Sequence, residues 1–338
     1  MRIGVDILEN EIVQQYPDVL DILIRDHTTQ KNIFWATDNY EHLGEVYAYN
    51  ASITPDLISG ENGDIIMPRV YKDQILQKAR SKEMAEVFTP SWICNAQNNL
   101  IDEAWFGNKE VFNREIINSD GSKSWETNPD KIKFPKGKTW KHYVRDTRLE
   151  IACGEAPYIT SRYDSTTGEF IPVENRIGIL DRKLRVINEN VENSGDWLKA
   201  AQTAYKNTYA FEWQGDSLLL AREAMLASFI ENYTHKFGKD PLLKSIQFIA
   251  YIISWNVWQM DGLKGVIPDS CGAVTVSEIN LFGEVHTSNH FCYGCMYNDI
   301  MRHNGIYCLI KDWSKKDPKT GKAGRKIKFI DLLNRKGK

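Results

Sequence analysis

The stretch LEIACGEAPY, residues 149–158, decides the fold that we expect for this chain. It begins as a short apolar strand and breaks at Gly154, in a turn flanked by acidic residues. Open α/β sheets bind nucleotides just beyond the C-terminal ends of their strands, at turns of this kind. Gly154 has no Cβ, so its backbone can approach a ligand closely. The stretch therefore predicts a strand that ends at a ligand-binding turn.

Strands and helices are expected to alternate on the C-terminal side of this stretch. The expected strands lie at 148–153, 208–213 and within 256–263, and the expected helices at 176–191, 217–237 and 242–254. A further helix is expected at 91–106, where apolar residues recur at helical spacing. This order predicts an α/β fold, with a mainly parallel sheet and helices on both faces.

Composition changes along the chain predict four regions. Residues 1–80 mix strand-like and helical pieces, such as NIFWAT at 33–38 and a helical run at 70–87. Residues 81–265 form the expected α/β core, with a polar excursion at 107–140 and an insertion at about 159–207. Residues 266–310 form a small Cys- and His-rich module, and residues 311–338 a basic tail.

A carboxylate at the end of the second expected strand is the second candidate binding group. Glu212 ends the segment TYAFE and precedes a helix that contains LLLAR. A carboxylate in this place can accept hydrogen bonds from the ribose hydroxyls of a bound nucleoside. Asp181 is the alternative ribose acid, although its amphipathic helical context favours a surface ion pair. We expect Glu212 to be the binding group.

Taken in order, these segments resemble the gamma class of DNA adenine methyltransferases, which includes the modification subunits of restriction–modification systems. Phe88, Thr89 and Pro90 correspond to the Phe-Thr-Pro segment of that family. Its strand-end loop of the form Asp-Pro-Ala-Cys-Gly is matched at four positions, namely Glu150, Ala152, Cys153 and Gly154. Glu212 falls at the family's ribose-binding acid, and Asp261 resembles the acid near the adenine of the cofactor. The resemblance covers roughly residues 80–270.

The resemblance implies a Rossmann-like fold, S-adenosylmethionine as cofactor and double-stranded DNA as substrate. Its implied protein partners are a specificity subunit, an endonuclease or a second methyltransferase chain. The family positions the target amine with a tetrapeptide of the form (Asn/Asp/Ser)-Pro-Pro-(Tyr/Phe), but this chain has no Pro-Pro dipeptide. Asn256 and Trp258 are the best substitutes, and Asp331 is a weaker one. Two functions therefore remain open: an active enzyme, or a degenerate subunit that needs a partner chain for methyl transfer.

The cysteine-rich module predicts a structural zinc site. Cys292 and Cys295 form a Cys-x2-Cys knuckle, followed by His303 and Cys308. Two thiolates at this spacing with a later His and Cys suit tetrahedral zinc. The competing fourth ligands are Cys271, His286 and His290. Buried free thiols or a redox pair are the alternatives to a metal.

Charge is distributed unevenly along the sequence. Residues 311–338 carry a net charge of +8, so the other 310 residues carry −11. A basic tail can contact phosphates or can be an ordinary solvated tail. Arg182, Lys183 and Arg185 can face DNA, but the default is that they decorate an exposed helix.

General features predict a soluble protein of the cytoplasm. No apolar run approaches the roughly 18 residues of a membrane span, and the start lacks the pattern of a secretory signal. Trp255, Trp258 and Trp313 can stack on bases or fill a core, and only Trp258 has a motif to support a functional role. A nuclease ranks last, because the first 80 residues lack a Pro-Asp…Glu-x-Lys pattern.

Overall fold

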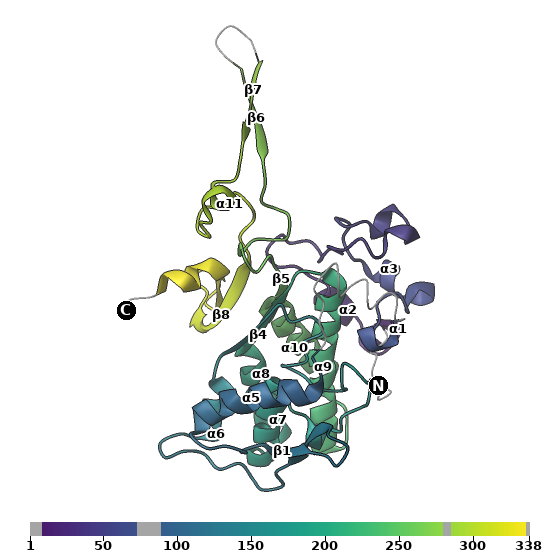
Figure 1. Ribbon diagram of the computed structural model, residues 1–338, viewed down its shortest axis with the longest axis vertical. Coiled ribbons are helices and arrows are strands. Elements are labelled where there is room, and N and C mark those ends of the chain that lie inside the picture. The colour runs from purple at the N-terminus through teal and green to yellow at the C-terminus, as the bar shows by residue number, and fades with distance from the viewer. Residues whose placement is uncertain (1–8, 73–88, 280–284, 336–338) are drawn as a thin grey trace.

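The computed structural model describes residues 9–72, 89–279 and 285–335 of the 338-residue chain (Figure 1). Its α-helices are α1 (Glu9–Gln15), α2 (Val19–Leu23), α3 (Pro55–Ile58), α5 (Ser91–Phe106), α6 (Trp140–Arg145), α7 (Ile179–Asn190), α8 (Ser194–Lys206), α9 (Gly215–Phe237), α10 (Leu243–Asn256) and α11 (Tyr293–Tyr297). Its strands are β1 (Asn113–Ile117), β2 (Lys123–Thr127), β3 (Arg148–Ile151), β4 (Thr208–Glu212), β5 (Val257–Gln259), β6 (Val274–Ile279), β7 (Val285–His290), β8 (Leu309–Lys316) and β9 (Ala323–Lys328). A 3-10 helix, η6, spans Phe329–Arg335.

A three-stranded parallel sheet in the order β3-β4-β5 lies at the centre of the molecule. The chain passes from β3 to β4 through α7 and α8, and from β4 to β5 through α9 and α10. Ile151 stands opposite Phe211 in the register, so Gly154 and Glu212 follow neighbouring strands at the same edge. The expected alternation of strands and helices is confirmed, and the expected insertion contributes α7 and α8.

The two faces of the sheet are covered differently. Ala210 and Val257 belong to the main hydrophobic core, which they share with α7, α8, α9 and α10. Phe211 and Trp258 point to the opposite face and join a smaller cluster, which is completed by residues of β8, β9, η6 and nearby loops. Helices were expected on both faces, whereas in the described residues this second cluster contains no α-helical side chain. The sheet is also smaller than expected.

The N-terminal region packs on the core of the α/β unit. Ile12, Leu20 and Trp35 are fully buried or nearly so, within the same cluster as the helices. The strand expected at 33–38 is wrong, since Phe34 makes only an isolated bridge with Ser52. Most of the helix expected at 70–87 lies outside the described residues.

Two hairpins follow the sheet. The antiparallel pair β6–β7 projects away from the rest of the molecule, and α11 lies at its base (Figure 1). The antiparallel pair β8–β9 lies beside the central sheet, so the basic C-terminal segment is a folded hairpin rather than a solvated tail. Within the described ranges, none of the helices combines the length and apolar character required to cross a lipid bilayer.

Candidate cofactor pocket and metal centre

A pocket of about 410 Å³ opens at the carboxyl ends of β3 and β4. The turn after β3 forms one wall, and α5 and the residues after β4 form the others. Its lining residues are Thr89, Gln97, Asn98, Ile101, Leu149, Glu150, Ile151, Ala152, Cys153, Gly154, Glu155, Pro157, Tyr158, Ile179, Glu212, Gln214 and Ser217. The pocket therefore lies where the sequence predicts the binding turn, and six of the nine predicted cofactor-binding residues line it. Of the other three, Pro90 and Asp261 are not in the lining, and Phe88 lies outside the described residues.

The turn after β3 holds its backbone in an uncommon conformation. Gly154 has φ +52°, and two alanines beside it, Ala152 and Ala156, have φ +48° and +59°. Left-handed backbone is unfavourable for residues with a Cβ, and it concentrates at binding sites. The Cys153 amide donates to the Phe211 carbonyl at 3.0 Å, which fixes the turn to β4. A Cβ on Gly154 would meet no atom within 4 Å, so this residue faces open space.

Glu212 ties the two strand ends together. Its Oε2 accepts the Gly154 amide at 2.8 Å, and its Oε1 accepts the amides of Trp213 at 2.8 Å and Gln214 at 3.3 Å. Burial raises the pKa of Glu212, and these amide hydrogen bonds oppose that rise. Because each carboxylate oxygen can accept two hydrogen bonds, Oε2 keeps capacity for one ligand hydroxyl.

Acidic side chains dominate the electrostatics of the pocket. Burial raises the pKa of Glu150 well above its usual range, and the charge of Glu212 adds to the rise. Glu150 Oε2 is buried without a hydrogen-bond partner in the described part of the chain. The lining residues include three acids and no Lys, Arg or His. Such a pocket favours a cationic ligand over one that carries phosphates, because an opposite charge stabilises ionised carboxylates.

The Phe-Thr-Pro segment leads into this pocket. Thr89 lines it, and Pro90 precedes the first residue of α5. Gln97 and Asn98 also line the pocket but were not predicted from the sequence. Their position two turns into the helix that follows the Phe-Thr-Pro segment was a signal that they lie near the pocket. Asn98 donates to the carbonyls of Tyr158 and Ile177, both at 3.0 Å, and so fixes α5 beside the turn.

Asn256 and Trp258, the predicted catalytic pair, do not line this pocket. Asn256 ends α10 just before β5, at the amino end of the sheet. Its amide group donates to the carbonyls of Tyr205 and Thr208, and its Oδ1 accepts the Trp313 indole N–H at 2.8 Å. Trp258 is buried on the sheet face away from the helices. The structure therefore does not bring the predicted catalytic pair to this pocket, because a residue just before a strand lies at the opposite end of the sheet from a pocket at the carboxyl ends of the strands.

Three further acidic residues that the sequence suggested as functional make their contacts outside the pocket. Asp261 Oδ1 accepts the amides of Leu263 and Lys264, and Oδ2 lies 3.1 Å from Lys264 Nζ, so it closes a turn outside the pocket. Asp181 accepts the Ser161 amide at 2.8 Å in the interior and is not a pocket residue. Asp331 lies in η6 and accepts the Lys328 amide at 3.2 Å.

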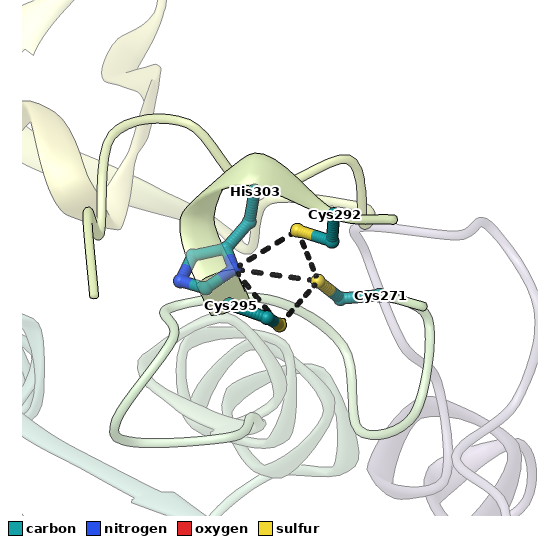
Figure 2. Close-up of side chains that lie close together, drawn as sticks. All are labelled: Cys271, Cys292, Cys295 and His303. Atoms are coloured by element: carbon teal, nitrogen blue, oxygen red, sulfur yellow. Dashed lines mark hydrogen bonds between the residues drawn. The ribbon is translucent and has the colours of Figure 1, made fainter. Parts of the chain in front are cut away.

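Four possible metal ligands converge at the base of the β6–β7 hairpin, as Figure 2 shows. They are Cys271, Cys292, Cys295 and His303, whose ligand atoms all lie within 4.8 Å of one another. Cys271 Sγ is 3.0 Å from Cys292 Sγ and 3.3 Å from His303 Nδ1. Three thiols and one imidazole are a donor set that suits structural zinc.

The position of Cys308 corrects the predicted ligand set. Cys308 directly precedes β8 and is fully buried. Its Sγ lies 3.4 Å from the carbonyl oxygen of Gln259. Burial raises its pKa, as expected for a thiol in an apolar cluster. Cys271, one of the competing ligands in the sequence, takes the fourth place. The side chains of His286 and His290 lie outside the described part of the structure.

Local structure makes room for the four ligands. Gly294 lies between the two cysteines of the knuckle, and a Cβ there would be 2.6 Å from His303 Nδ1. The Asn304 amide donates to Cys292 Sγ at 3.4 Å. Burial raises the pKa of Cys292, but hydrogen bonds, above all from Cys271, outweigh burial and lower it to about 6. These contacts favour the thiolate form, which binds metals, at Cys292. Burial and the neighbouring thiols raise the pKa of Cys271 to about 12 instead.

The basic residues of α7 are structural. Arg182 is buried and its guanidinium lies 2.6 Å from Asp102 of α5. Lys183 is buried and donates to the carbonyls of Asp146 at 2.6 Å and Asn207 at 3.0 Å. Arg185 pairs with Glu189 at 2.9 Å. The expectation that these residues decorate an exposed helix is wrong for Arg182 and Lys183, because both point into the bundle.

Comparisons of this chain with models of protein families, with curated proteins and with solved structures found no match.

Proposed function

We propose that this chain binds S-adenosylmethionine at the carboxyl ends of β3 and β4, as the cofactor-binding subunit of a DNA adenine methyltransferase. One observation carries the proposal: the pocket beside the strained Gly154 turn contains Glu150 and Glu212 and no basic side chain. S-adenosylmethionine carries a sulfonium, an ammonium and a carboxylate group, so it is a net cation, and it has no phosphate. The pocket's charge therefore favours it over phosphate-bearing nucleotides.

The roles of individual residues follow from their contacts. Glu212 Oε2 has capacity to accept a ribose hydroxyl while it still holds the Gly154 amide. Glu150 has a buried oxygen without a partner in the described residues, and a cationic group of the ligand would compensate its charge. When bound, the cofactor supplies an activated methyl group, so the protein mainly has to orient the acceptor.

The step that the described residues support least is orientation of the acceptor amine. An adenine in a duplex must be flipped out of the stack before its amine can reach a methyl donor. Asn256, the best amide by sequence, is fully hydrogen-bonded at the opposite end of the sheet. This placement favours the second function, in which a partner chain completes the acceptor site, over an enzyme that works alone.

Expression of the chain alone in a host that lacks adenine methylation tests both functions. Sequencing that detects methylated adenine should find no methylated motif, whereas the purified chain should bind S-adenosylmethionine. A fixed methylated motif would instead show that the chain transfers methyl groups without a partner. Absence of both methylation and cofactor binding would contradict the proposal itself.

We also propose that the Cys271–Cys292–Cys295–His303 cluster holds zinc in a structural role. Its support is a donor set of three thiols and an imidazole at the base of an isolated hairpin. A two-stranded ribbon has too little core to be stable alone, and a bound metal compensates for this.

A further inference from the structure

A cluster of lysines and aromatic rings, which we call the lysine–tryptophan site, lies between α8, α10 and the β8–β9 hairpin. It comprises Lys206, Lys311, Lys326, Trp255 and Trp313. The Lys311 Nζ is 4.6 Å from the centre of the Trp255 ring and 5.0 Å from that of Trp313. The Nζ of Lys326 is 5.2 Å from the Trp255 ring, and that of Lys206 is 5.4 Å from the Trp313 ring. Aromatic rings thus hold three ammonium groups in place.

These positive charges repel one another. Lys311 and Lys326 stand directly opposite across the β8–β9 ladder, an arrangement that destabilises a hairpin. Burial lowers the pKa of Lys206, and the charge of Lys311 lowers it further. His27 stacks on Trp255, with ring centres 4.1 Å apart. Burial lowers the pKa of His27 to about 3, and the charges of Arg222, Lys311, Arg25 and Lys326 contribute.

Negative partners for these lysines are missing from the described residues. There, none of Lys206, Lys311 and Lys326 lies within 4.0 Å of a carboxylate oxygen. Lys311 Nζ has the Tyr251 hydroxyl as its hydrogen-bond partner, at 2.5 Å. The buried Trp255 N–H has no acceptor in the same part of the chain. The site thus has an excess of donors and of positive charge, which an anion would compensate.

A cavity of about 390 Å³ opens beside the site. Its lining includes three lysines, Lys206, Lys311 and Lys315, and one acid, Asp312, which lies 3.8 Å from the Lys315 Nζ. Leu149 lines both this cavity and the candidate cofactor pocket, so the two hollows adjoin at the edge strand β3. The hairpin continues the positive surface with exposed Lys316, Lys319 and Lys322. Lysines interleaved with aromatic rings are typical of surfaces that follow a nucleic-acid backbone.

We propose that the lysine–tryptophan site binds the phosphate backbone of DNA and places it beside the cofactor pocket. This inference deepens the proposed function, since it names the DNA-contacting surface of that subunit. The β8–β9 hairpin would contact successive phosphates through its lysines, with Trp255 and Trp313 fixing the amines at the centre. The contact needs no base-specific group, so affinity depends on salt and hardly on sequence.

Fluorescence anisotropy of a labelled 20-base-pair duplex, without cofactor, tests the site separately from the pocket. The full chain carrying Lys206→Gln and Lys326→Gln should bind at least about tenfold more weakly at low salt. Its plot of log affinity against log salt should lose about 2 units of slope, because each phosphate contact contributes roughly 0.9. Arginine at both positions should restore binding, because it keeps the charge. Thermal melting curves verify that each variant is folded.

The matched control is Lys133→Gln with Lys136→Gln, which removes the same charge from an exposed loop elsewhere. This variant should keep the wild-type slope. An equal loss in both double variants, or a wild-type affinity that does not change with salt, would overturn the proposal. Competition by poly-glutamate as effective as that by unlabelled DNA, charge for charge, would also overturn it and would indicate an acidic protein as the partner. Loss of cofactor binding with DNA binding intact would contradict the proposed function alone.

Discussion

Gly154 and Glu212 lie 58 positions apart in the sequence and 2.8 Å apart in space, from amide nitrogen to carboxylate oxygen. Their pairing could be predicted because each residue follows an apolar strand, and parallel strands end at one edge of a sheet. The fourth ligand at Cys271 could not be chosen from its competitors, because 20 residues separate it from the knuckle and only the fold brings them together. Asn256 was singled out for its amide side chain although it stands at the start of the expected strand, and the structure accordingly places it at the end of the sheet opposite the pocket.

Lys183 shows how a surface-like pattern can hide a buried charge. Burial lowers the pKa of Lys183 to about 7, below the usual value of 10.5. Between these two values the unfolded chain binds more protons than the folded chain, so the free energy of unfolding should rise with pH by up to about 1.4 kcal/mol per unit. We expect Lys183→Met to flatten this rise from pH 7 to 10, as measured by urea unfolding. An unchanged slope in the variant would exclude Lys183 as its source.

At the scale of elements, the helices were the most predictable part of the chain. The expected helices at 217–237 and 242–254 agree with α9 and α10 to within about two residues. The second sheet face was not predictable, because the hairpin that covers it comes from the basic segment at 311–338. High charge suggested a solvated tail, but Ile310 and Ile327 alternate with lysines and provide an apolar face.

The β6–β7 hairpin and α11 should depend on the metal. Purified full chain should contain one zinc ion per molecule by atomic emission spectroscopy, because four ligands converge at one point. Cys271→Ser should reduce the zinc content to a small fraction of this value. Cys308→Ser is the matched control and should keep one zinc ion, since Cys308 lies in the apolar cluster beside β5. Equal zinc contents in the two variants would contradict the assignment of Cys271.

The whole molecule places two hollows of opposite character side by side. The candidate cofactor pocket contains acids and no basic residue, whereas the lining of the cavity beside it contains three lysines and one acid, Asp312. Leu149 is common to both linings. This division corresponds to the two ligands of the proposed function, a cationic cofactor and an anionic nucleic acid. The central sheet ends at β3, where Leu149 and Ile151 keep 44% and 69% of their surface exposed. This exposed apolar edge is where a partner chain that completes the acceptor site would pack.

Titration calorimetry of the full chain with S-adenosylmethionine tests the central claim most directly. We expect one binding site per chain, with no detectable binding of ATP, because the pocket lining lacks basic residues. Ile101→Trp should weaken binding at least about tenfold, since Ile101 lines the pocket. Leu100→Trp, on the same helix but outside the pocket and 65% exposed, should bind as the wild type does. No heat of binding with S-adenosylmethionine, or equal affinities of the two tryptophan variants, would contradict the account.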